Sequence, residues 1–162
     1  MLEPAMRTAY RCAHLMLRSY WFVRRPRTNG ALAALWLDGK ILLVKNSYRK
    51  QHSLPGGYVK RGEDARLAAY VRPGEDPRQA ASREVHEEIR IHVPPEKFDL
   101  AYHGTRPFEF RSDTLDIYEA ELDAAPDLRI DQVEVVWAGF KTPDEARAMN
   151  IVPHLREYLE GR

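Results

Sequence analysis

The chain has 162 residues, of which 44% are hydrophobic and 30% charged, an ordinary composition for a single globular domain with its own core. Its formal net charge is only +1, so bulk charge selects no polyanionic partner, and its one cysteine excludes an intrachain disulfide or a cysteine-rich metal site. No apolar run reaches the roughly 18 residues of a membrane span, and we expect a cytoplasmic location.

The N-terminal segment 1–27 has the most uneven charge, with six arginines and one acid. Apolar residues recur there at steps of three and four, which predicts an amphipathic helix over 4–23. The arginines lie on another side of that helix. This basic side is either solvated, or it contacts an anionic membrane surface or a partner. The recurring apolar residues are Met6, Tyr10, Ala13, Leu17 and Trp21.

The rest of the chain alternates predicted strands and helices. Apolar runs at 31–37 and 41–45 flank Asp38-Gly39, which predicts a hairpin. Proline at the first helical position predicts two helix starts, after the caps Asp76 and Thr142. We expect further strands at 98–103, 114–122 and 133–140, a helix from Asp76 to about Arg90, and a final helix after Pro153.

A twelve-residue phrase occurs twice in succession. Residues 58–69 read YVKRGEDARLAA and residues 70–81 read YVRPGEDPRQAA, with eight identical pairs. About one pair in eighteen would match by chance at ordinary composition. The repeat is therefore a tandem duplication, and it lies directly after the Leu54-Pro55-Gly56-Gly57 turn.

The predicted helix after the repeat carries three glutamates at positions i, i+3 and i+4, namely Glu84, Glu87 and Glu88. This spacing places their side chains on one face of a helix, where like charges repel by a few tenths of a kcal/mol per pair. Such a face is either simply solvated, or it binds a hard divalent cation through its oxygens. Ala81, Val85 and Ile89 form the opposite, buried stripe.

The region 54–91 resembles the Nudix box, G-x5-E-x7-R-E-U-x-E-E-x-G-U, where U is a bulky aliphatic residue. Glu75, seven residues and then Arg83-Glu84-Val85-His86-Glu87-Glu88 match its second half, and Gly57, five residues and Glu63 match its first half. The two halves use different glutamates because the duplication splits the box by twelve residues. Arg90 stands where the pattern has glycine, and we expect a different helix exit there.

The resemblance implies a Nudix-type α/β/α sandwich around a mixed β-sheet, with an additional N-terminal helix, as a single domain over 1–162. It also implies a hydrolase that cleaves a diphosphate linkage in a nucleoside diphosphate derivative. Glu84, Glu87, Glu88 and the backbone carbonyl of Gly57 would bind Mg²⁺, with Mn²⁺ as an alternative. Arg83 would orient the upstream glutamate of the box, here Glu75 or Glu63.

The general base remains open at this stage. Glu84 is the first choice, and Glu109, Glu119, Glu121 and Glu134 are alternatives. We interpret His86 as structural. The groups that could contact substrate are Lys45, Arg49, Lys50 and His52, with Tyr48, Tyr58 and Tyr102 as stacking surfaces. The expected partner is a small nucleotide, and an RNA 5′ end is conceivable without any RNA-recognition module in the sequence.

A second function fits the split box. A catalytically weakened domain of the same family would bind nucleotides, a partner or a membrane surface instead of turning over substrate. Loop closure costs only about 0.6 kcal/mol per doubling of length, so we expect folding to survive the insertion. Catalysis is more sensitive, because a displacement of about 1 Å can lower a rate a hundredfold.

Overall fold

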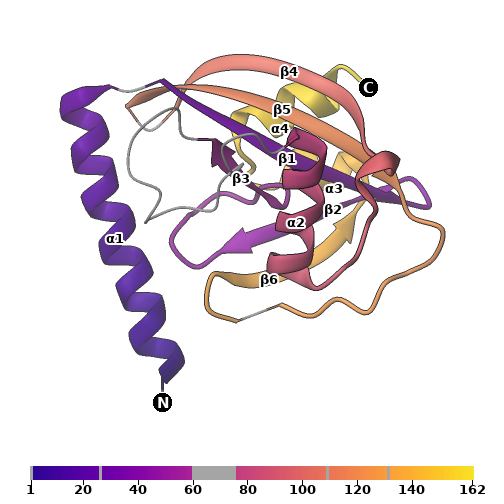
Figure 1. The fold of residues 1–162 in the computed structure, drawn as a ribbon, viewed down its shortest axis with the longest axis horizontal. Helices are drawn as coiled ribbons and strands as arrows, with labels where there is room; N and C mark the ends of the chain where they lie inside the picture. The colour runs from indigo at the N-terminus through magenta and orange to yellow at the C-terminus, as the bar shows by residue number, and fades with distance from the viewer. Residues whose placement is uncertain (1, 26, 60–75, 109, 131) are drawn as a thin grey trace.

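The fold was obtained as a computed structural model, which describes residues 2–25, 27–59, 76–108, 110–130 and 132–162. Most of the duplicated segment, including Glu63 and Glu75, lies outside these residues. The elements are α1 (Leu2–Arg24), β1 (Arg27–Leu37), β2 (Lys40–Asn46), β3 (Gly56–Val59), α2 (Pro77–Ile89), a 3₁₀ turn η1 (Pro95–Lys97), β4 (Asp99–Phe108), β5 (Arg111–Glu121), β6 (Val135–Lys141), α3 (Pro143–Ala148) and α4 (Pro153–Glu160) (Figure 1).

A mixed sheet forms the centre of the molecule, with strand order β4-β5-β1-β2-β6. The long central strand β1 pairs in parallel with β5 along one edge. Its other edge pairs antiparallel with β3 near its start and with β2 near its end. The β1–β2 hairpin turns at Asp38 and Gly39, whose φ angles of 48° and 72° are those of the expected tight turn.

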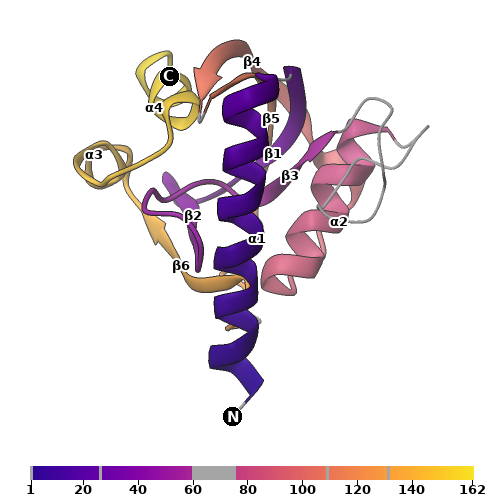
Figure 2. The same cartoon turned by 90° about the vertical axis from the view of Figure 1, so that its left-hand side faces the viewer.

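Helices cover both faces of the sheet, which confirms the expected α/β/α sandwich (Figure 2). On one face, α2 packs through Ala81, Val85 and Ile89, all buried, so the predicted apolar stripe is confirmed. On the other face, Leu155 and Leu159 of α4 join a second apolar cluster. None of the helices within the described residues is long and apolar enough to cross a membrane.

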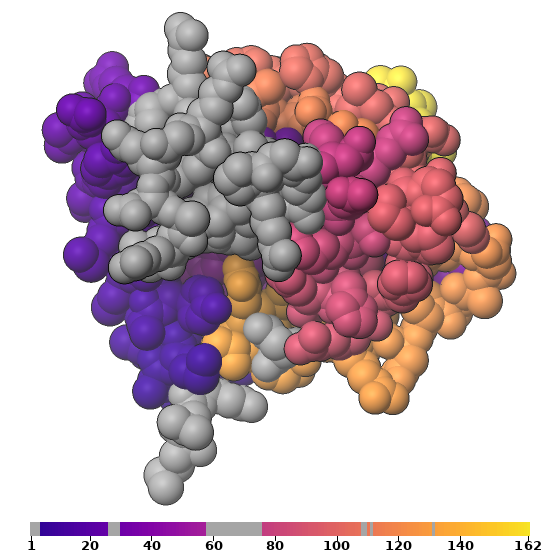
Figure 3. Space-filling view, in the orientation of Figure 1, coloured from indigo at the N-terminus to yellow at the C-terminus, as the bar shows by residue number. Residues whose placement is uncertain are grey.

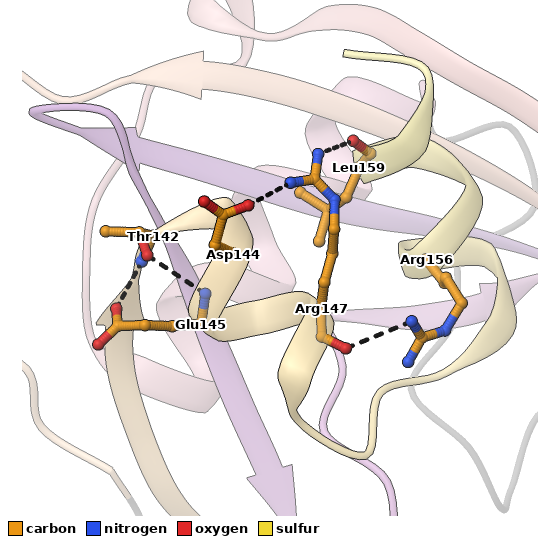
Figure 4. A network of polar contacts seen from close by, with 6 residues as sticks. All are labelled: Thr142, Asp144, Glu145, Arg147, Arg156 and Leu159. Atoms are coloured by element: carbon orange, nitrogen blue, oxygen red, sulfur yellow. Dashed lines mark hydrogen bonds and ion pairs between the residues drawn. The ribbon is translucent and has the colours of Figure 1, made fainter.

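Local capping sets the helix starts. The Asp76 carboxylate accepts a hydrogen bond from the N–H of Arg78 at 2.8 Å, as the sequence predicts for α2. Thr142 caps α3 as predicted, and it forms a reciprocal capping box with Glu145. Figure 4 shows this box beside Arg147, whose guanidinium reaches the carbonyl of Leu159 and so ties α3 to α4.

Four expectations about the fold are wrong. The strand expected at 98–103 is β4, which runs on to Phe108 because it pairs with β5 over that length. The strand β1 begins at Arg27 rather than Ala31, because its first residues pair in register with β5. The chain at Gly56–Val59 is strand β3, where the sequence predicts only a tight turn, because it pairs with β1 over 29–32. Arg90 does not change the helix exit, since it adopts the left-handed conformation (φ 60°, ψ 23°) that glycine normally supplies.

Candidate active site

The helix α2 carries the three glutamates, and its packing decides how each one points. With Val85 and Ile89 against the sheet, the side chains of Glu84 and Glu88 turn inward and are 2% and 8% exposed. Glu87 lies one step further round the helix, and its side chain is 50% exposed. The structure therefore separates the three carboxylates into a buried pair and a third group at the surface.

Arg83 bridges two of these carboxylates. Its guanidinium donates to Glu84 at 2.6 Å and to Glu87 at 3.2 Å. A short charge-assisted bond of this kind fixes the orientation of a carboxylate. Arg83 thus orients two members of its own helix, while the upstream glutamates expected as its partner, Glu63 and Glu75, lie outside the described residues.

Burial dominates the electrostatics of the inward pair. It raises the pKa of Glu84 to about 7, although Arg83 pulls that pKa downward. Burial, followed by the charges of Glu134 and Glu84, raises the pKa of Glu88 well above its ordinary range. Titratable groups shifted this way by their surroundings are characteristic of functional sites.

The Pro-Gly-Gly turn lies beside Glu88. The N–H of Gly56 points to a Glu88 carboxylate oxygen at 3.4 Å. Gly56 has φ 144°, and a Cβ there would lie 2.4 Å from the carbonyl oxygen of Ala31, so only glycine fits. Gly57 is buried and pairs with Ala31 in the next register position of β3.

The four alternative acids fall in different places. Glu134 precedes β6, and its charge raises the pKa values of both Glu84 and Glu88, so it belongs to the same site. Glu119 instead bonds Tyr158 and Arg162 on the other side of the sheet. Glu121 is exposed, and Glu109 lies outside the described residues.

Two neighbouring residues from the loop after β2 complete the surroundings of this site. The Tyr48 hydroxyl donates to Glu134 Oε1 at 3.2 Å. Arg49 lies 5.6 Å from the Tyr48 ring centroid, and its charge lowers the pKa of Glu88. Arg49 is therefore the sequence-predicted cation that faces the carboxylates, and Tyr48 is the predicted aromatic residue that lies with them.

The other predicted contact residues have the following partners or positions. Lys45 donates to the carbonyl of Lys50. His52 meets the edge of the Trp137 ring, and Tyr102 bonds Glu157 of α4. The remaining one, Tyr58, lies on β3, and His86 is exposed on α2 beside His92.

The donor set suits a hard divalent cation, which prefers oxygen ligands. A buried carboxylate is costly to keep ionised without a positive charge beside it, and a bound cation would supply that charge. Glu84 and Glu88 are such carboxylates, and their raised pKa values measure that cost. Among the residues that the structure describes, no three acidic, histidine or cysteine side chains already converge as a ready metal cage. The fit to a cation is therefore one of donor chemistry.

Comparison with known proteins identifies the family. The model of the NUDIX domain matches residues 26–160, most of the chain, with α1 outside the match. The chain belongs to the NUDIX domain family. It is a Nudix-type hydrolase, a class that acts on pyrophosphate bonds. No curated protein sequence matches the chain.

Solved structures share the fold at low identity. The MutT protein of Methanosarcina mazei Go1 is 17% identical, with a TM-score of 0.67 over 85% of this chain and 94% of its own. The dihydroneopterin triphosphate pyrophosphohydrolase of E. coli is 17% identical, with a TM-score of 0.64 over 82% and 92%. The NUDIX domain of Shewanella oneidensis NrtR, solved with ADP ribose, is 18% identical, with a TM-score of 0.61 over 85% and 86%.

Proposed function

We propose that the protein is a Mg²⁺-dependent hydrolase that cleaves the diphosphate linkage of a nucleoside diphosphate derivative. The observation that carries the proposal is the buried pair Glu84 and Glu88, held inside a NUDIX fold at a cost in folding stability. Natural proteins tolerate such local conflicts mainly where function requires them. Relatives of the same fold include a triphosphate pyrophosphohydrolase and a domain bound to ADP ribose, which is the substrate chemistry we infer here.

In this proposal, Glu84, Glu87, Glu88 and the Gly57 carbonyl would hold the cation. When bound, it would supply positive charge for the diphosphate oxygens and lower the pKa of the attacking water. The water oxygen forms a bond to one phosphorus, and the bond from that phosphorus to the bridging oxygen breaks. Two phosphate-containing products result, and the bridging oxygen leaves with the second of them.

We assign Glu84 as the group that accepts the proton of the attacking water. Its side chain is buried in the site, and Arg83 holds its carboxylate in one orientation through a 2.6 Å hydrogen bond, as a group that accepts a proton requires. Glu134 is the competing assignment, since it faces the same carboxylates from the start of β6. Arg83 keeps Glu84 oriented, and Arg49 offers a positive charge for the substrate phosphates.

The test assays purified protein with Mg²⁺ against nucleoside triphosphates, ADP-ribose, dinucleoside polyphosphates, nucleotide sugars and 5′-triphosphate RNA. Turnover should be lost in Glu84→Gln and Glu88→Gln. The matched control is Glu160→Gln, an exposed glutamate at the end of α4, which should keep full activity. No release of phosphate or monophosphate from any substrate by the wild type would overturn the proposal.

The duplication favours a second candidate, a domain that binds a nucleotide without efficient turnover. Twelve additional residues separate Gly57 from Glu75, so the two halves of the box no longer share one glutamate. In this reading, the basic and partly apolar α1 contacts a partner or an anionic membrane surface. A variant lacking 58–69 separates the candidates: if only the shortened protein hydrolyses substrate, the binding role is favoured, and equal rates favour the enzyme.

A further inference from the structure

The helix α1 lies outside the matched NUDIX segment, yet it contacts the two loops that border the site. Arg11 Nε donates to the carbonyl of Ser47 at 3.2 Å, in the loop after β2. Arg7 Nε donates to the carbonyl of Gln132 at 2.8 Å, in the loop before β6. Figure 2 shows α1 running along the open end of the sandwich, between α2 and β6.

The middle of α1 packs on Tyr48. The ring of Tyr10 stacks on that of Tyr48 with 6.3 Å between centroids and 9° between planes. His14, one turn further along α1, lies 5.0 Å from the same ring. Aromatic pairs of this kind contribute about 0.5–1.5 kcal/mol beyond simple burial, which is enough to hold one side chain in place.

Tyr48 in turn is tied to Glu134. Its hydroxyl donates to Glu134 Oε1 at 3.2 Å and accepts from the Asn46 amide at 3.4 Å. The N–H of Ser47 also donates to the Glu134 carbonyl at 2.8 Å. The two loops are therefore joined by one main-chain and one side-chain hydrogen bond. Both bonds involve Glu134, the acid whose charge acts on Glu84 and Glu88.

We propose that α1 is an intramolecular brace of the active site. Tyr10 and His14 are positioning residues that hold Tyr48, and Tyr48 holds Glu134 beside the carboxylates of α2. The consequence for turnover rests on the proposed hydrolase function, whereas the consequence for the two loops does not. In Figure 3 indigo and orange atoms meet at the surface, in keeping with the contact of α1 with the loop before β6.

The brace explains why one side of α1 makes contacts while its other side is exposed. Met16 and Val23 on its outer side are 74% and 77% exposed, so packing against the sheet does not hold α1. Contacts with the two loops, from Arg7, Arg11, Tyr10 and His14, hold its first half, and Phe22 meets the Phe110 ring near its end. Losing them frees Tyr48 and Glu134 together, and a shift of about 1 Å at a reacting group can cost a hundredfold in rate.

The experiment compares Tyr10→Ala/His14→Ala with a control double variant on the outer side of α1, Met16→Ala/Val23→Ala. Hydrogen exchange of 46–50 and 132–135 is read by mass spectrometry. We expect exchange there to rise at least tenfold in the first variant and to stay unchanged in the control. Equal exchange in the two variants would overturn the proposal.

Steady-state kinetics give the second readout, on the best substrate of the panel. Tyr10→Ala/His14→Ala and Tyr48→Phe should lower kcat about ten- to a hundredfold with little change in KM, and Tyr10→Phe/His14→Phe, which keeps the ring contacts, should restore the rate. A fall in kcat for the control variant, or no rescue by the aromatic pair, counts against the brace. If even the wild type has no turnover, the proposed function fails, and the exchange comparison still decides the role of α1.

Discussion

The two faces of the sheet surround their acidic side chains differently. On the α4 face, the Trp36 indole donates to the Tyr158 hydroxyl at 2.9 Å, and that hydroxyl donates to Glu119 at 2.6 Å. Arg162 closes this network on Glu119. On the α2 face, burial raises the pKa values of Glu84 and Glu88 despite their polar neighbours.

The difference separates structural polar groups from functional ones. A satisfied network stabilises a fold, since each of its buried donors and acceptors has a partner. Carboxylates that are buried at a cost instead mark a site where a ligand supplies the missing charge. Substitutions on the two faces should therefore change different observables, activity on the α2 face and stability on the α4 face.

The largest expected effect is on activity and belongs to the α2 face. Glu88→Gln removes a charge from the centre of the site, and kcat should fall at least about a hundredfold, as when one group that stabilises the transition state is lost. The midpoint of urea unfolding in EDTA should not fall. Loss of activity through a lower unfolding midpoint would show that Glu88 is structural, like the acids of the other face.

On the α4 face, Tyr158→Phe should do the reverse. The substitution removes the hydroxyl that joins Trp36, Glu119 and Arg162, and leaves the buried indole N–H without its acceptor. We expect a loss of about 2 kcal/mol in the free energy of unfolding. The kcat should remain within twofold of wild type, and a larger drop would mean that the two faces are coupled.

A pH series on Glu84→Gln sharpens the same comparison. The Glu84 pKa rises from 4.5 unfolded to about 7 folded, so the folded protein binds this proton more tightly. The free energy of unfolding is therefore highest below pH 4.5, where Glu84 is protonated in both states. It falls as pH rises through 7 and the buried carboxyl loses its proton. Without divalent cations, the variant should exceed wild type by about 1–2 kcal/mol at pH 8 and by little at pH 5, measured by urea unfolding. An equal gain at both pH values would contradict the assigned pKa.

Much of the fold could be predicted because its signals are local. The caps Asp76 and Thr142, the Asp38-Gly39 turn and the stripe of α2 each act within a few residues of chain. Strand β3 could not be predicted, because its four residues become a strand only by pairing with β1.

The site was predictable to a similar degree. The spacing of Glu84, Glu87 and Glu88 identifies the helix, but only packing shows that Glu87 is the exposed one. The selection of Glu134 among four acids, and its link to Tyr48, depend on loops 86 residues apart in the chain. The contacts of Tyr10 and His14 are equally long-range, and no motif in the sequence records them.

The smallest expected effect concerns the end of α2, where Arg90 occupies a conformation that favours glycine. The left-handed region destabilises a residue with a Cβ by about 1 kcal/mol or more. Glycine avoids this strain but loses more conformational entropy on folding, so the two effects partly offset each other. Arg90→Gly should therefore stabilise the protein by about 0.5–1 kcal/mol. Arg90→Ala, which removes the charge but keeps the Cβ, should change the unfolding midpoint little. If Arg90→Ala stabilises as much as Arg90→Gly, the charge of Arg90 and not its backbone conformation lowers the stability of this helix end. In that case electrostatics would constrain α2 at its end as well as along its carboxylate face.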